Sequence, residues 1–273
     1  MSLLSPASSA ALSRLRTYRP PSASVYTSLP LSRRAAVLVL LFADPRGDLR
    51  VVLTMRSPLL RTFAGQVALP GGKADFLEET AWMTARREAW EEIGLPMHGV
   101  DVEHLAELPC TLARTLLGVR PCVAFLKENA GEMVPRLQEG EVEGVFTVRL
   151  EPFLSRKYPL RGGKEEPWYD SKGSVGWVGR RWCMHEFSAP VWEKGQVRRH
   201  RVWGMTARIL VDVARVAYGR DPEFAFDKDI GFEDAIWQLK KEGKMEEVPK
   251  KPDPEVEPEK VVEEAARKGS SNL

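Results

Sequence analysis

Four segments of the chain carry the apolar pattern of β-strands. The first two, 35–43 (AAVLVLLFA) and 49–55 (LRVVLTM), are rich in aliphatic and β-branched residues and are separated by the turn-forming stretch DPRGD. This arrangement predicts a β-hairpin. Similar apolar segments at 119–126 and 142–148 predict two further strands.

Helical periodicity is found in two other places. Between Glu79 and Ile93, apolar residues recur along one predicted stripe, formed by Trp82, Ala85, Ala89 and Ile93. Gly94 fits the left-handed position that ends a helix, and Pro96 prevents continuation. A second helix is predicted after Trp203, where a four-residue step relates Met205, Ile209, Val213 and Ala217. Strands mixed with helices predict an α/β fold.

The chain divides into four parts on this pattern. They are an N-terminal extension (1–32), a main domain (33–225), a short C-terminal helical segment (226–243) and a tail (244–273). The tail has no aromatic residue, four prolines and many charges of both signs, which predicts disorder. Within the main domain, the Gly- and Arg-rich stretch 155–182 is predicted to leave the core as a hairpin or a loop that covers substrate.

The N-terminal extension has two interpretations. Before Asp44 the chain lacks acidic residues and is rich in Arg and Ser, which is typical of a mitochondrial transit peptide. Leu12 and Leu15, three residues apart, instead favour a short helix at 10–18 that docks on the core. We favour this helix, and otherwise expect the extension, like the C-terminal tail, to be disordered.

Composition narrows the classes of function. The 273 residues carry 40 Lys and Arg against 38 Asp and Glu, a formal net charge of +2, so nucleic-acid binding is not expected. The longest apolar run, 35–43, is about half as long as a membrane span, so no membrane association is expected. Cys110, Cys122 and Cys183 lie far apart, which excludes a disulfide scaffold and a Cys-based zinc site.

The segment 69–95 (LPGGKADFLEETAWMTARREAWEEIGL) carries the clearest chemistry. Glu88, Glu91 and Glu92 fall on one face of the predicted helix, where their negative charges repel one another. A hard divalent cation bound by carboxylate oxygens would relieve this repulsion. The turn at 70–72 (PGG) lets the backbone approach the same place. A solvated acidic face is the alternative, and a di-iron site is disfavoured because no Glu-x-x-His follows.

This segment resembles the Nudix box, whose pattern is G-x5-E-x7-R-E-U-x-E-E-x-G-U with U apolar. Residues 87–95 match its second half. The first half departs, because the interval from Gly72 to Arg87 is one residue longer than the pattern. Glu79 keeps the spacing to Arg87, whereas Glu78 keeps the spacing from Gly72. One of the two is expected to pair with Arg87, and the sequence does not choose between them.

The longer first half is similar to the coenzyme A diphosphatase branch of the Nudix superfamily. That branch also has an upstream signature, L-L-T-x-R-[SA]-x3-R-x3-G-x3-F-P-G-G. The residues at its spacings are Leu53, Thr54, Arg56, Ser57, Arg61, Gly65, Pro70, Gly71 and Gly72. Val52 and Leu69 replace the first Leu and the Phe. The segments 141–146 and 203–207 also resemble the branch, so the resemblance covers about 33–218.

The resemblance implies a Nudix fold, an α/β/α sandwich around a mixed β-sheet, and hydrolysis of a diphosphate with the help of Mg²⁺ or Mn²⁺. The implied metal ligands are Glu88, Glu91, Glu92 and Gly71. The residues implied in catalysis are Glu91, Glu92, Arg87 and Glu141, and the three glutamates are alternative bases for the attacking water. The residues implied in substrate binding are Arg56, Arg61 and Gly72, since a guanidinium can hold two phosphate oxygens at once.

The branch further implies coenzyme A and its derivatives as substrates, cleaved to 3′,5′-ADP and (acyl-)4′-phosphopantetheine. One alternative is a hydrolase of oxidised purine nucleoside triphosphates. The other is a catalytically silent binding module, which the retained carboxylates disfavour. The final residues, Ser271-Asn272-Leu273, resemble the peroxisomal S-K-L address, so a peroxisomal import receptor is an expected partner. Mitochondrion and cytoplasm are the alternative locations.

Overall fold

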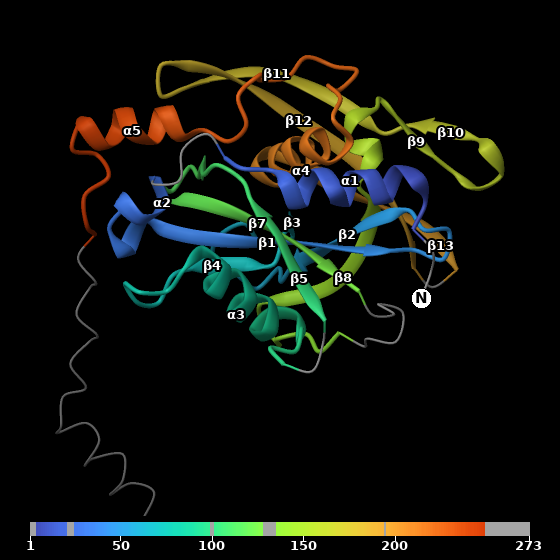
Figure 1. Ribbon diagram of the computed structural model, residues 1–273, viewed down its shortest axis with the longest axis horizontal. Helices are drawn as coiled ribbons and strands as arrows, with labels where there is room; N and C mark the ends of the chain where they lie inside the picture. Colours follow the sequence, from blue (N-terminus) through green and yellow to red (C-terminus); the bar gives the residue numbers. More distant parts are fainter. Residues whose placement is uncertain (1–3, 21–24, 99–100, 128–134, 194, 249–273) are drawn as a thin grey trace, which may run out of the picture.

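A mixed β-sheet with helices on both faces forms the body of the molecule (Figure 1). The computed structural model describes residues 4–20, 25–98, 101–127, 135–193 and 195–248. Helix α3 (Ala81–Ile93) packs on one face of the sheet, below it in Figure 1. Helices α1 (Pro6–Thr17) and α4 (Gly204–Tyr218) pack on the other face. The predicted α/β/α sandwich around a mixed sheet is confirmed.

Eight strands form the main sheet. They are β1 (Arg34–Ala43), β2 (Leu49–Arg56), β3 (Val67–Ala68), β4 (Gly71–Lys73), β5 (Val102–Glu107), β6 (Thr111–Leu112), β7 (Gly118–Leu126) and β8 (Val142–Arg149). Strands β1 and β2 form the predicted antiparallel hairpin, and β1 runs parallel to β7. Strand β8 pairs with β2. The four predicted strands are therefore all present; β2, β1 and β7 form the centre of the sheet, and β8 pairs with β2.

The centre of the sheet is buried on both faces. Because side chains alternate along a strand, Val39 and Leu41 of β1 contact the apolar cluster beneath α1 and α4. Leu38 and Leu40 contact the cluster beneath α3. This double burial explains why β1 reads as a continuous apolar run rather than an alternating one.

Helix α3 has a defined beginning and end. Thr80 caps its N-terminus by accepting a hydrogen bond from the amide of Met83 at 3.2 Å. Gly94 ends it in the left-handed conformation (φ 70°), as predicted. Ala85 and Ala89 are fully buried and bring the helix close to the sheet. Trp82, predicted in the same stripe, is instead half-buried and stacks on a histidine of β5.

The N-terminal extension contains a helix, α1, that is longer than the predicted helix at 10–18. Helix α1 buries Ala11, Leu12 and Leu15 completely against the core, because its apolar face fits beside α4. Ser5 caps the helix, which therefore begins four residues before the predicted position 10. Disorder is thus the wrong prediction for this segment, and docking is confirmed. A short helix, α2 (Val25–Ser28), and a 3₁₀ turn, η1 (Leu31–Arg33), lead into β1.

The excursion predicted at 155–182 is larger than expected. It contains a hairpin of β9 (Lys157–Pro159) and β10 (Glu165–Pro167) and a three-stranded antiparallel sheet that extends to Trp203. The strands of that sheet are β11 (Tyr169–Trp177), β12 (Arg180–Glu193) and β13 (Gln196–Trp203). Two 3₁₀ turns, η3 (Glu151–Leu154) and η4 (Arg161–Gly163), flank β9.

The C-terminal helical segment contains α5 (Glu233–Lys241). Beyond it, Met245 is buried, and the amide of Val248 donates a hydrogen bond to Ser32 Oγ at 2.9 Å. Residues 244–248, which were expected to begin the disordered tail, therefore pack on the body. Residues 249–273 lie outside the described part of the chain. Within the described ranges, no helix is long and apolar enough to cross a membrane.

Candidate active site

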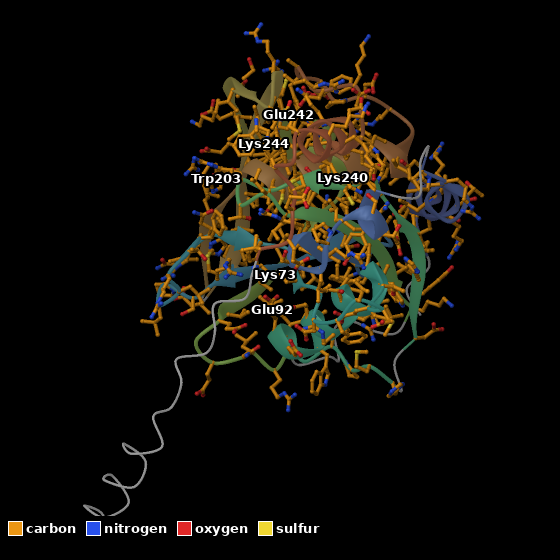
Figure 2. The ribbon with its side chains drawn as sticks, turned by 90° about the vertical axis from the view of Figure 1, so that its left-hand side faces the viewer. Lys73, Glu92, Trp203, Lys240, Glu242 and Lys244 are labelled. Carbon is orange, nitrogen blue, oxygen red and sulfur yellow. The ribbon has the colours of Figure 1, made fainter. Side chains whose placement is uncertain are left out.

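The three carboxylates of α3 differ strongly in exposure. Glu92 is 5% exposed, Glu88 is half-buried and Glu91 is exposed. Each step of one residue turns about 100° around a helix, so the three side chains run from the sheet side of α3 to solvent. Glu92 lies close to β4, whose Lys73 is labelled beside it in Figure 2.

The glycines of β4 lie directly against these carboxylates. The amide of Gly71 donates a hydrogen bond to Glu92 Oε2 at 3.2 Å. A Cβ atom on Gly72 would lie 2.3 Å from Glu88 Oε1, and one on Gly71 would lie 2.4 Å from the carbonyl oxygen of Ala36. Backbone packing therefore requires a glycine at position 71, whereas a side chain at position 72 would displace the carboxylate of Glu88.

Arg87 joins the carboxylates to the loop before α3. Its Nε donates to Glu79 at 2.8 Å, and its Nη1 donates to Glu88 at 3.1 Å and to Glu91 at 3.2 Å. Glu79 is 3% exposed, whereas Glu78 is exposed to solvent. The two alternatives left open by the sequence are therefore resolved, since Glu79 is the partner of Arg87.

The buried carboxylate of Glu92 has a strongly perturbed pKa. Burial raises the pKa of Glu92 to about 8, and the negative charges of Glu88 and Glu141 act in the same direction. The Gly71 amide and the positive charge of Arg56 oppose this rise. Burial also raises the pKa of Glu88, although Arg87 opposes it. The burial of negative charge at Glu92 and Glu88 is thus only partly offset by Arg56 and Arg87, and a bound cation would offset more of it.

The donor set fits a hard divalent cation, because it consists of carboxylate oxygens. Among the described residues, however, no three His, Cys, Asp or Glu side chains stand in a ready-made metal-binding arrangement. Arg87 Nη1 is bonded to oxygens of both Glu88 and Glu91. A cation at these carboxylates would compete with that guanidinium group.

Two residues from other elements approach the same carboxylates. Arg56, at the end of β2, is half-buried, and its Nε is buried without a hydrogen-bond partner in the described structure. The charges of Arg56 and of Glu141, just before β8, both shift the pKa of Glu92, which places them near it. The carbonyl of Glu141 accepts a hydrogen bond from the Ser57 amide at 2.8 Å. Arg61 is exposed on the loop between β2 and β3.

Comparison with known proteins agrees with this fold and this cluster of residues. The NUDIX domain model matches residues 32–169, and the chain belongs to the Nudix family of hydrolases. It is 33% identical over 258 residues to a Saccharomyces cerevisiae protein named peroxisomal coenzyme A diphosphatase 1, covering 76% of this chain and 75% of that protein.

Two relatives from Arabidopsis thaliana are also similar. Nudix hydrolase 15, mitochondrial, is 41% identical and is matched over 70% of this chain and 61% of its own length. Nudix hydrolase 22, chloroplastic, is 40% identical and is matched over 72% of this chain and 59% of its own length. The chain thus spans about three fifths of each plant relative.

Proposed function

We propose that the protein hydrolyses the diphosphate linkage of coenzyme A and its derivatives, giving 3′,5′-ADP and (acyl-)4′-phosphopantetheine. The observation that carries this proposal is the buried Nε of Arg56, which has no hydrogen-bond partner in the described structure and belongs to a side chain whose charge acts on the buried carboxylate of Glu92. A guanidinium group and a cluster of carboxylates together suit a diphosphate that binds along with a divalent metal ion. The similarity to a relative named coenzyme A diphosphatase supports the choice of substrate.

Mg²⁺ or Mn²⁺ would be held by Glu88, Glu91 and Glu92, with Gly71 beside them. When bound, such a metal ion neutralises diphosphate charge and lowers the pKa of a coordinated water. Arg87 contributes by fixing Glu88 and Glu91 relative to the loop that holds Glu79. Gly72 leaves the space that Glu88 occupies.

The proton of the attacking water requires a carboxylate acceptor, and Glu91, Glu92 and Glu141 are the three alternatives. Glu91 is bonded to Arg87, and Glu92 is buried and bonded to the Gly71 amide. Glu141 is exposed and near Glu92. We favour Glu141, because Glu91 is paired with Arg87 and Glu92 is proposed as a metal ligand, whereas Glu141 has neither role.

Substrate phosphates would be held by Arg56 and Arg61. Arg56 lies at the carboxylates and is the residue proposed for the diphosphate. Arg61 is exposed on the adjoining loop and is the residue proposed for an outer phosphate of the substrate. The two arginines are five residues apart on the segment that leads from β2 to the glycines of β4.

A product assay by mass spectrometry tests the proposal. The protein would be incubated with coenzyme A, NADH, ADP-ribose and 8-oxo-dGTP, each with Mg²⁺ or Mn²⁺. We expect 3′,5′-ADP and 4′-phosphopantetheine from coenzyme A as the preferred reaction. Preferred cleavage of 8-oxo-dGTP would instead support the nucleotide-sanitising alternative, and no cleavage of any substrate would support a silent binding module.

A peroxisomal location is proposed on two grounds. The C-terminal Ser271-Asn272-Leu273 is similar to a peroxisomal address, and one relative is named peroxisomal. The plant relatives are named mitochondrial and chloroplastic, so location differs among similar chains.

A further inference from the structure

Phe63 has a backbone conformation that side chains other than glycine rarely adopt. Its φ is +54°, and within the described ranges Leu116 and Val178 are the other non-glycine residues with positive φ. Val178 and the following glycine form the turn between β11 and β12. Leu116 lies in the turn between β6 and β7. Both side chains are partly buried against the core cluster beneath α3, so turn geometry and packing account for them.

Neither turn geometry nor packing explains the positive φ of Phe63. It is 49% exposed and belongs to neither core cluster. Its carbonyl accepts a hydrogen bond from the Gln66 amide at 3.3 Å, which makes it the first residue of a turn, a position that requires no positive φ. Glycine or asparagine would adopt this φ with less strain. The aromatic ring is therefore not needed by the chain itself, and strain of this kind is concentrated at functional sites.

The loop that carries Phe63 is fastened to the candidate active site. At its base, the Arg56 amide donates to the Gln66 carbonyl at 3.0 Å, and the Gly65 amide donates to the Arg56 carbonyl at 3.2 Å. The Ser57 amide donates to the carbonyl of Glu141. Phe63 is thus held on a loop that closes onto Arg56, and the next residue, Ser57, is bonded to Glu141. The charges of Arg56 and Glu141 both act on the carboxylate of Glu92.

The same loop carries the guanidinium group of Arg61, two residues before Phe63. Arg61 and Phe63 are both exposed, and a cation and an aromatic ring on one short loop suit a ligand that has both a phosphate and a flat ring. A purine nucleotide has this chemistry. Aromatic side chains bind bases by stacking, without regard to the hydrogen-bonding edge.

We propose that Phe63 is a specificity-determining residue that stacks on the purine ring of the substrate. The identity of that substrate rests on the proposed function, whereas the stacking itself requires only a purine nucleotide. Removal of the ring should weaken binding in the ground state and the transition state equally, so KM should change and kcat should not.

The test compares Phe63→Asn with Phe63→Trp. Asparagine tolerates the positive φ but has no ring, whereas tryptophan keeps a stacking surface. For coenzyme A, we expect Phe63→Asn to raise KM about 10-fold or more and to leave kcat within about 2-fold, and Phe63→Trp to restore a KM near wild type. Leu59→Asn is the matched control, because Leu59 is 82% exposed on the same loop and its φ is not positive. It should leave KM unchanged.

A binding measurement separates this inference from the proposed function. Calorimetric titration of the metal-loaded protein with 3′,5′-ADP and with inorganic pyrophosphate needs no turnover. Phe63→Asn should lose affinity for 3′,5′-ADP about 10-fold and keep its affinity for pyrophosphate. Unchanged affinity for 3′,5′-ADP would refute stacking even if coenzyme A is the substrate. Equal losses for both ligands would show a distorted loop, and a KM effect confined to long acyl derivatives would assign the ring to the acyl chain; either result overturns the proposal.

Discussion

The carboxylate of Glu79 accepts a hydrogen bond from Arg87 Nε at 2.8 Å, although the two residues stand on different elements and Glu79 is almost completely buried. Burial alone would raise the pKa of Glu79, but the bonds from Arg87 and from the Asp75 amide outweigh it, and the pKa is lowered. The pair fixes the loop before α3 to the guanidinium that also contacts Glu88 and Glu91. The positions of Glu88 and Glu91 thus depend, through Arg87, on Glu79, which is not one of the three carboxylates of α3.

Replacing Glu79 by Gln should destabilise the fold. The change removes the negative charge that pairs with the half-buried guanidinium of Arg87, and we expect a loss of about 3 kcal/mol in the free energy of unfolding. Urea denaturation at pH 7 measures this loss. The control is Glu78→Gln, because Glu78 is adjacent in sequence but exposed. Equal stability of the two variants would contradict the assigned pairing.

The same pair predicts how stability depends on pH. A group whose pKa is lowered by folding stabilises the protein above its unfolded pKa, and this contribution is lost as pH falls through the folded pKa. Wild type should therefore lose stability below about pH 4.5, the ordinary value for Glu79. The difference in unfolding free energy between wild type and Glu79→Gln should shrink over the same range. A difference that stays constant down to pH 3 would argue against an ionised Glu79.

The central fold was predictable because its signals are local. Strands β1 and β2 and helices α3 and α4 each bury a regular set of side chains, so their periodicity is visible in the sequence. Strand β13 was not predicted, because Arg198, Arg199 and Arg201 are exposed and leave no apolar alternation. For helix α1, the two leucines were the only signal of docking in the sequence. The surface on α4 that they contact is distant in sequence.

The carboxylate cluster of α3 was predictable from spacing, but its contacts were not. Spacing alone identifies Glu88, Glu91 and Glu92, yet it cannot show that Glu92 is buried while Glu91 is exposed. It also cannot choose between Glu78 and Glu79, because the extra residue lies in a loop whose path is fixed by a contact with Arg87. Such contacts depend on the three-dimensional path of the chain and leave no periodic signal.

Glu88→Gln and Glu92→Gln should each reduce turnover at least ~10²-fold. The amide keeps the shape and the hydrogen-bonding reach of the side chain but removes a charged oxygen ligand from the principal electrostatic component of the site. Steady-state kinetics at limiting Mg²⁺ measure the effect, and circular dichroism checks the fold. Glu139→Gln, at an exposed position outside the cluster, is the control. Near wild-type activity of either variant would remove α3 from the proposed metal site.

Arg61→Ala should raise KM for coenzyme A more than it lowers kcat. A phosphate contact made equally in the bound substrate and in the transition state contributes uniform binding. Kinetics with dephospho-coenzyme A, which lacks the 3′-phosphate, then locate the contact. If Arg61 binds the 3′-phosphate, Arg61→Ala should not change KM for this substrate. Arg46→Ala, an exposed arginine in the turn between β1 and β2, serves as the control. If KM is unchanged for both substrates, Arg61 is a surface cation.

A fluorescent fusion with a free C-terminus should give a punctate peroxisomal signal that becomes diffuse when 271–273 are deleted. The reason is that a receptor reads such an address at an accessible chain end. We also expect the mature protein to keep helix α1, because Leu12 and Leu15 are buried in the core and their removal would expose the apolar side chains that they cover. Mass spectrometry of the purified protein checks this. A chain beginning near residue 20 that co-fractionates with mitochondria would overturn the prediction.

Binding of Mg²⁺ or Mn²⁺ should release a proton at neutral pH. In the metal-free protein, burial raises the pKa of Glu92 from its ordinary 4.5 to about 8, so this carboxyl group is largely protonated at pH 7. A raised carboxyl pKa stabilises the fold at low pH, and the contribution is lost as pH rises from 4.5 towards 8.

A cation requires the ionised form and must displace that proton, so its affinity should increase up to about 10-fold per pH unit below pH 8 and then level off. Calorimetry at pH 6.5 in two buffers of different ionisation enthalpy should detect about one proton released per metal, and almost none at pH 9. Glu92→Gln should bind the metal more weakly and release no proton at either pH. Affinity that is independent of pH between 6 and 8 would show that Glu92 is not the residue whose ionisation is coupled to the metal.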